Sequence, residues 1–110
     1  MRLQIKGKNL EVSDSIRAYA EQKLRKLQKQ LGEQVQVELE LSCEKNPSIR
    51  ENQVAEATVF TKGHSLRARE ASRDMRASID GLTDKLLREV KTYREKRRRE
   101  PRRRAERNDA

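Results

Sequence analysis

Residues suited to covalent, redox or metal chemistry are scarce in this sequence. The 110-residue chain has one cysteine (Cys43), one histidine (His64) and no tryptophan. A single cysteine cannot form a disulfide within the chain, and one cysteine with one histidine excludes the usual zinc sites made of protein ligands alone. Neither residue has the partner groups that a nucleophile or a general base needs. We therefore expect no enzyme, no cofactor and no metal, and we interpret His64 as an ordinary turn residue.

Segments that bind nucleotides or enter membranes are also missing. The four glycines are scattered, so they cannot form a glycine-rich phosphate-binding loop. No apolar run is long enough to span a bilayer, and the N-terminal residues alternate in polarity where a signal peptide would have an apolar core. We therefore expect a cytoplasmic protein with no membrane contact and no small-molecule substrate.

Positive charge is what the chain has in excess. Charged residues make up 41% of the sequence and hydrophobic residues 33%, with a net charge of +9 and a pI of about 10.1. Residues 94–110 alone hold nine Lys or Arg against four Asp or Glu. Such an excess predicts a polyanionic partner, nucleic acid ahead of an anionic membrane. The chain length predicts one domain with one small core.

Two segments have the apolar periodicity of a helix packed on one side. The first follows Ser13, a good N-cap, and ends at Gly32. The second spans residues 72–99, with Ser72 as the predicted N-cap and Asp74 in the first turn. The predicted buried positions are Ile16, Ala20, Leu24, Leu27 and Leu31 in the first helix, and Met75, Ile79, Leu82, Leu86, Val90 and Tyr93 in the second.

Four segments alternate between apolar and polar residues, which predicts strands with one buried face. They are residues 1–7, 34–43, 53–61 and 65–70. In the third strand we expect Ala55, Ala57 and Val59 to point inward. Lys62 and Gly63 predict a tight hairpin turn before the fourth strand.

The element order β-α-β-β-β-α predicts an α+β fold. The first two strands are joined through a helix and should be parallel, whereas short loops make the others antiparallel. This gives a two-layer sandwich, a four-stranded sheet with both helices on one face. We assign residues 1–96 to this domain. Residues 97–110 are predicted to be a disordered basic tail, because Ala105 and Ala110 are their only apolar residues and Pro101 should end any helix.

The outer sides of the two helices are the best candidate binding surface. Long cationic side chains bind phosphates and release counterions. The alternative is an ordinary solvated face, with Asp80, Asp84 and Glu89 pairing some of the cations. The basic tail is likewise either a nucleic-acid contact or a solubilising segment. The helix candidates are Lys23, Arg25, Lys26, Lys29, Lys85, Arg88, Lys91 and Arg94.

Aromatic side chains are too few for a stacking surface on the sheet, where only Phe60 is expected to point outward. We expect Tyr19 and Tyr93 to pack at the edges of the apolar stripes, with their hydroxyl groups toward water.

Several segments resemble the ribosome hibernation-promoting factor family, also labelled ribosome-associated inhibitor or sigma-54 modulation protein. They are LQIKGKNLEVSDSIRAYAEQKLRKL in residues 3–27, and AEATVF, GHSLRARE and DMRASIDGLTDKLLREVKTYREK in residues 55–96. The element order with a basic helix pair also resembles the double-stranded-RNA-binding fold with an extra first strand.

The family resemblance implies a ribosome hibernation factor. Such a factor binds the small ribosomal subunit in the channel of messenger and transfer RNA and inhibits translation under stress. Its partner would be the ribosomal RNA backbone, with ribosomal proteins as further candidates. The family's basic helix end falls on Lys91, Tyr93, Arg94 and Lys96. The complete set of RNA-binding candidates is then Lys23, Arg25, Lys26, Lys29, Lys85, Arg88, Lys91, Tyr93, Arg94 and Lys96.

Two other functions stay open. One is a general double-stranded-RNA-binding module, which the fold analogy favours. The other is a regulator of a transcription factor by protein contact, although the sequence predicts no exposed apolar patch for it. Long family members carry a further domain that dimerises ribosomes. This sequence stops in a basic tail, so we predict no ribosome dimerisation by this chain alone.

Overall fold

The fold follows the predicted order of elements. The computed structural model describes the backbone of residues 1–109 and the side chains of residues 1–96. The strands lie in the order β1-β2-β3-β4, with β1 parallel to β2 and the other neighbours antiparallel, as predicted. The elements are β1 (Arg2–Lys8), α1 (Asp14–Leu31), β2 (Gln36–Cys43), β3 (Gln53–Thr61), β4 (His64–Ser72) and α2 (Met75–Asp109).

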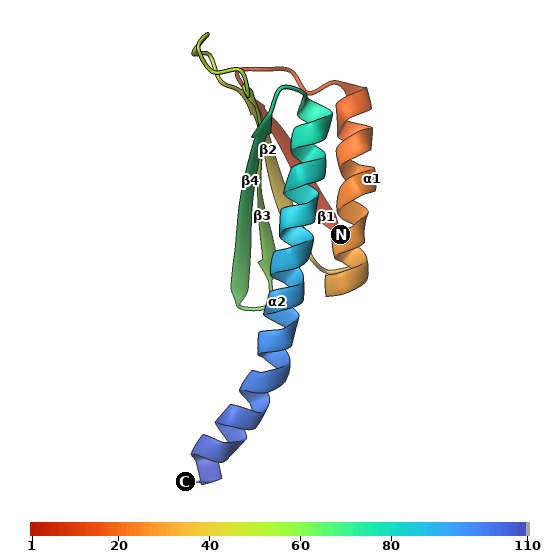
Figure 1. Ribbon diagram of the computed structural model, residues 1–110. Coiled ribbons are helices and arrows are strands. Elements are labelled where there is room, and N and C mark those ends of the chain that lie inside the picture. The colour runs from red at the N-terminus through yellow and green to blue at the C-terminus, as the bar shows by residue number, and fades with distance from the viewer. Residues whose placement is uncertain (110) are drawn as a thin grey trace.

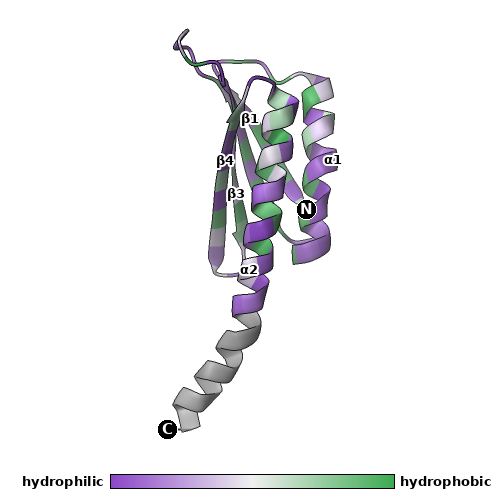
Figure 2. Ribbon diagram, viewed as in Figure 1, coloured by the Kyte–Doolittle hydropathy of each residue, from purple (hydrophilic) through white to green (hydrophobic). Residues whose placement is uncertain are grey.

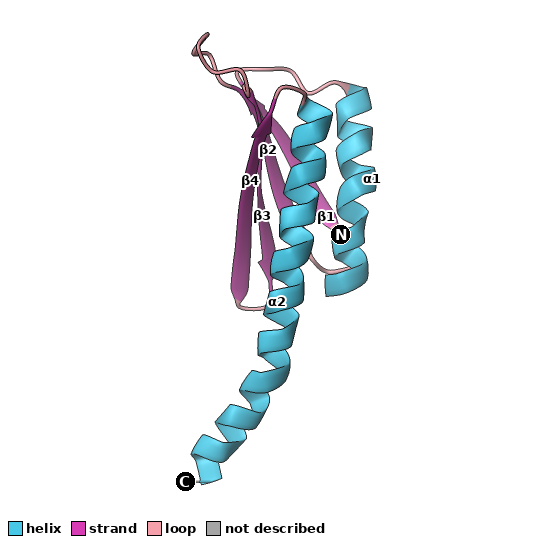
Figure 3. Ribbon diagram, viewed as in Figure 1, coloured by secondary structure: helices cyan, strands magenta, loops and turns pink. Residues whose placement is uncertain are grey.

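Both helices cover the same face of the sheet and lie side by side, running in the same direction (Figures 1 and 3). The apolar stripes of the helices face the sheet, and hydrophilic residues cover their outer sides (Figure 2). The core includes Leu24 and Leu27 of α1, Leu39 of β2, and Leu82 and Leu86 of α2, none more than 1% exposed. The α+β sandwich expected from the sequence is therefore confirmed.

The predicted inward register of β3 is also confirmed. Ala55, Ala57 and Val59 are at most 1% exposed, and Ala57 lies opposite Leu39 on one side and Ala68 on the other. Alanines at these positions leave room for α2 to lie close over β3 and β4. The opposite face of the sheet is not covered by a helix (Figure 1).

The ends of α1 are capped as the sequence predicts. The Ser13 hydroxyl accepts a hydrogen bond from the Ile16 backbone N–H at 3.1 Å. At the other end Gly32 has a φ of +95° and donates its N–H to the Gln28 carbonyl at 2.8 Å. A positive φ favours glycine, which has no Cβ to clash with the backbone.

The start of α2 differs from the prediction. Ser72 is the last residue of β4, opposite Gln53, and the helix begins at Met75. Asp74 is the cap, because its carboxylate accepts the Ala77 N–H at 3.3 Å. Aspartate caps as well as serine does, and pairing with β3 keeps Ser72 in the sheet. The Asp74 charge therefore precedes the first turn.

The other end of α2 also differs. The backbone stays helical to Asp109, so the prediction that Pro101 ends the helix is wrong. An interior proline costs a helix about 3 kcal/mol, but Arg, Glu and Lys on both sides of it are good helix formers. The side chains of residues 97–110 lie outside the described part. A domain boundary at residue 97 and a disordered tail stay predictions.

Truncating a central core residue tests the packing. Leu39→Ala should lower the free energy of unfolding by about 2–5 kcal/mol, because it leaves a cavity between the sheet and the helices. Urea denaturation followed by circular dichroism measures this change. Glu38→Ala, at the exposed neighbouring position, is the control and should stay within about 0.5 kcal/mol of wild type. Equal stability of the two variants would contradict the core assignment.

Candidate nucleic-acid interface

Polar contacts hold the two helices together along the length over which they lie side by side. Arg76 donates to the Ser15 hydroxyl at 2.6 Å, near the start of both helices. Farther along, Arg94 of α2 donates to the side-chain oxygen of Gln30 of α1. Between these ends, the Tyr19 hydroxyl donates to Asp80 at 2.6 Å. The outer sides of α1 and α2 thus form one continuous surface with a fixed register.

Asp80 is the centre of this network. Besides the Tyr19 hydrogen bond, its carboxylate lies 3.4 Å from the ammonium of Lys23. The Tyr19 ring also interacts with two cations, Lys23 Nζ at 5.5 Å and the Arg76 guanidinium at 5.3 Å from its centroid. The sequence-based expectation of a water-facing Tyr19 hydroxyl is wrong, because the helices approach closely enough for Asp80 to accept a hydrogen bond from it.

The pKa values of Tyr19 and Lys23 shift in the direction that preserves their contacts with Asp80. The hydrogen bond to Asp80, followed by desolvation, raises the pKa of Tyr19. The negative charge of Asp80 raises the pKa of Lys23. Lys23 therefore stays cationic at neutral pH, but a neighbouring carboxylate already balances its charge.

Five of the ten predicted RNA-binding residues are exposed and make no hydrogen bond or ion pair within residues 1–96. We call Arg25, Lys26, Lys29, Lys91 and Lys96 the open cations. Arg88 is exposed as well and contacts only the Asp84 carbonyl of its own helix, at 3.4 Å. These side chains meet no competing acidic group in the described part of the chain, so they can bind phosphates without breaking an internal contact.

The other predicted cations are engaged within the protein. Lys85 lies 3.4 Å from Glu70 and donates to the Arg69 carbonyl at 2.9 Å, so it points toward β4 and away from α1. Lys23 pairs with Asp80 and Arg94 with Gln30, as described above. The ten residues therefore do not form one uniform surface. Of the three acidic residues expected to pair, only Asp80 forms an ion pair among the described side chains.

Tyr93, the remaining candidate, stacks on His64. The ring centroids are 5.0 Å apart and the planes differ by 16°. Phe60 lies on the uncovered face of the sheet and is 39% exposed, as predicted. Arg76 and Tyr19 are not among the predicted site residues. Their role depends on the register between two helices that are distant in sequence, for which a single sequence carries no signal.

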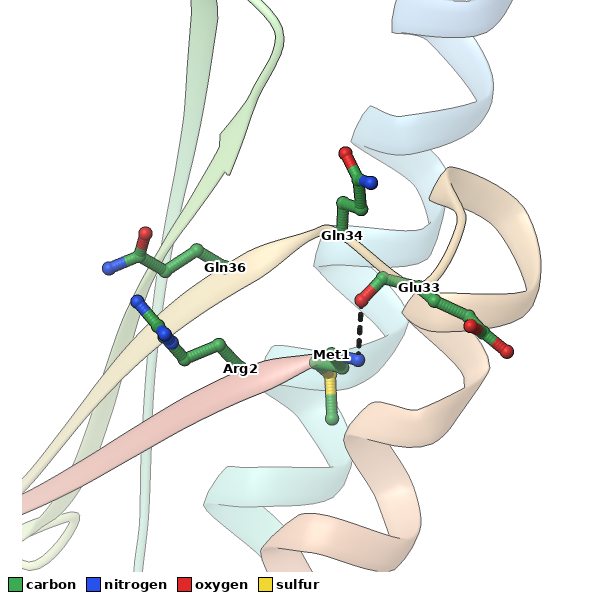
Figure 4. A pocket seen from close by; sticks show the side chains of 5 residues that line it. All are labelled: Met1, Arg2, Glu33, Gln34 and Gln36. Carbon is green, nitrogen blue, oxygen red and sulfur yellow. Dashed lines mark hydrogen bonds between the residues drawn. The ribbon is translucent and has the colours of Figure 1, made fainter.

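The described part of the chain offers little support for a small-molecule pocket, a metal site or a membrane-spanning helix. A hollow of about 360 Å³ is lined by Met1, Arg2, Glu33, Gln34 and Gln36. Figure 4 shows the N-terminal ammonium donating to the Glu33 carbonyl at 2.7 Å, while the Glu33 carboxylate points away from Arg2 and Gln36. Residues 1–96 contain no group of three acidic, histidine or cysteine side chains that could hold a metal. None of the described helices is long and apolar enough to cross a membrane.

Removing the Asp80 charge tests the network. Asp80→Asn should lower the pKa of Tyr19 toward its ordinary value of 10.0, because an amide accepts the hydroxyl's hydrogen bond more weakly than a carboxylate does and has no charge to oppose the phenolate. Ultraviolet titration of phenolate absorbance in a Tyr93→Phe background reports Tyr19 alone. Because the folded-state pKa is raised, the stabilisation is complete below about pH 10 and is lost as the pH rises through the raised value.

Asp84→Asn is the matched control, since this exposed carboxylate lies one turn later and makes no described side-chain contact. It should leave the Tyr19 titration unchanged. The same Tyr19 pKa in both variants would show that Asp80 does not control the network.

Comparisons with known proteins place the chain in a family. Residues 3–98 match the family model described as sigma 54 modulation protein / S30EA ribosomal protein. A ribosome hibernation promotion factor of Picosynechococcus is 39% identical over 87% of this chain and 50% of its own length. The ribosome hibernation promoting factor of Escherichia coli K12 is 32% identical over 87% of this chain and 96% of its own length. The chain thus spans about half of the first relative and nearly all of the second.

Solved structures agree with the fold. The Protein Y N-terminal domain of Thermus thermophilus is 31% identical, with a TM-score of 0.72 over 84% of this chain and 99% of that domain. A ribosomal subunit interface protein of Coxiella burnetii has a TM-score of 0.73 at 22% identity, over 86% of this chain and 98% of its own. The role of the chain is non-enzymatic, as predicted. The chain belongs to the sigma 54 modulation protein / S30EA ribosomal protein family, which confirms the resemblance found in its sequence.

Proposed function

We propose that this chain is a ribosome hibernation factor of the cytoplasm. It binds the small ribosomal subunit in the channel that messenger and transfer RNA occupy, and it inhibits translation under stress. The observation that carries this proposal is the set of open cations on a helix pair whose register is fixed by internal contacts. The names of the relatives from Picosynechococcus and Escherichia coli support it.

The surface is suited to the RNA backbone. Each phosphate contact by Lys or Arg releases counterions, which favours binding and makes it depend on salt. Because the internal contacts already fix the two helices, binding orders only the ends of the open side chains, which limits its entropic cost. Backbone contacts fix the position of the domain without selecting a base sequence. Inhibition follows from occupancy, since a folded domain in the channel excludes messenger and transfer RNA.

The engaged cations have a different part in this mechanism. Lys23 and Arg94 hold α1 against α2, and Lys85 holds α2 against β4. We propose that they position the surface and contact RNA less than the open cations do. Ribosome dimerisation is not part of the proposal, because the chain matches only about half of the longer relatives.

Removing open cations tests the electrostatic mechanism. Lys26→Gln, Lys29→Gln and Lys91→Gln combined should weaken binding to small ribosomal subunits. The plot of log affinity against log salt should become shallower by about 0.7–0.9 for each phosphate that the variant no longer neutralises. Co-sedimentation over a range of salt concentrations measures both effects.

The control carries three Lys→Gln changes at other exposed positions, Lys6, Lys8 and Lys45. This control has the same net charge as the helix variant, but it should keep the wild-type slope of log affinity against log salt. If the slope becomes equally shallow in both triple variants, the attraction is diffuse and the helix surface is not the site.

Cell-free translation with the same proteins tests inhibition. Wild type should inhibit at a stoichiometric amount, and the helix variant should not. Stoichiometric binding without inhibition would mean that the domain docks outside the channel. Tight binding to a plain RNA duplex, with no binding to ribosomes, would favour the general duplex-binding function.

A further inference from the structure

An aromatic stack lies where the β3–β4 turn meets α2. His64 is the first residue of β4, and its ring lies against Tyr93 with centroids 5.0 Å apart. Figure 1 shows this turn beside the part of α2 where the helix extends past the sheet. The stack is thus at the end of the helix surface that carries Lys91 and Lys96.

The two rings are fixed by the fold before any ligand binds. Tyr93 packs against the hydrophobic core and continues the buried stripe of Leu86 and Val90. His64 is held by pairing with Thr61, whose hydroxyl donates to the His64 carbonyl at 3.2 Å. Gly63, with a φ of +72°, permits the tight turn between them. A ring fixed in this way loses little conformational entropy when a planar group stacks on it.

The stack has an exposed side with cations next to it in the chain. Tyr93 lies against one face of the imidazole, and His64 is an exposed residue, so the other face is the one available to a ligand. Lys62 is exposed in the same turn, and Lys96 is exposed one helical turn after Tyr93. Aromatic faces flanked by cations are the combination that binds single-stranded nucleic acid.

We propose that an unpaired base of single-stranded RNA stacks on the open face of His64, with Lys62 and Lys96 at the adjoining phosphates. The inference rests on the proposed ribosome binding and adds a base contact to a surface otherwise made of phosphate contacts. Every base has a flat π-face, so the contact tolerates any sequence. The competing explanation is that His64 only packs the hairpin onto α2.

Three substitutions of His64 separate these explanations. Alanine removes both the ring and the packing, leucine keeps apolar packing on Tyr93 without a ring, and phenylalanine keeps both. Affinity for purified small ribosomal subunits is measured by sedimentation at one salt concentration. His64→Ala and His64→Leu should weaken binding about 5- to 150-fold, the range for removal of one stacked base. His64→Phe should stay within about twofold of wild type. Thermal unfolding of each variant checks that it folds.

Phe60→Ala is the matched control, because it removes an exposed ring from the opposite face of the sheet. It should bind as wild type does. Full affinity of His64→Leu would assign the ring to hairpin packing and overturn the inference. Equal affinity of all variants would overturn it as well, while leaving the proposed function in place. No binding by wild type would overturn the proposed function and this inference together.

Discussion

Burial of one face of the sheet is the constraint on which the rest of the structure depends. The alternating strands give the sheet an apolar face, and covering it is the main source of stability available to a chain with 33% hydrophobic residues. The crossover from β1 to the parallel β2 places α1 on that face, and the connection after β4 places α2 beside it. The two helices must therefore lie next to each other, so that their outer sides form one surface.

A surface of this kind needs internal contacts as well as charge, because adjacent cationic helices repel each other. Asp80 offsets this repulsion between the helices by binding Tyr19 and Lys23, and Glu70 has the same role between α2 and β4 by pairing with Lys85. Such half-exposed ion pairs each add little stability, but they fix side-chain positions. The cations thus fall into an engaged group that fixes the register and an open group that is available to a polyanion.

The sequence predicts features that depend on neighbouring residues better than contacts between residues far apart in the chain. The strands, the Ser13 cap, the Gly32 stop and the inward register of β3 depend on local patterns, and the sequence predicts them correctly. The start of α2 differs from the prediction because two good caps, Ser72 and Asp74, compete and strand pairing decides between them. The Tyr19–Asp80 bond and the His64–Tyr93 stack join residues far apart in the chain. Apolar periodicity in the sequence does not indicate contacts between residues so far apart, so these two pairs become evident only in the folded structure.

Cations alone do not identify the binding face, because the uncovered face of the sheet carries Lys6, Arg67 and Arg69 as well. There, cross-strand neighbours supply the opposite charge: Lys6 lies opposite Glu40, Arg69 lies opposite Glu56, and Arg67 contacts Glu56 at 3.3 Å. These cations also relieve the repulsion between Glu40 and Glu56, which face each other across β2 and β3. Strand pairing thus places an acidic residue beside each of these three cations, whereas Arg2 and Lys8 of the edge strand β1 lie opposite the neutral Gln36 and Ser42. The open cations of the helices form no ion pair among the described side chains. Under the proposed function, the difference between the two faces, more than the net charge of +9, would orient the domain toward a polyanion.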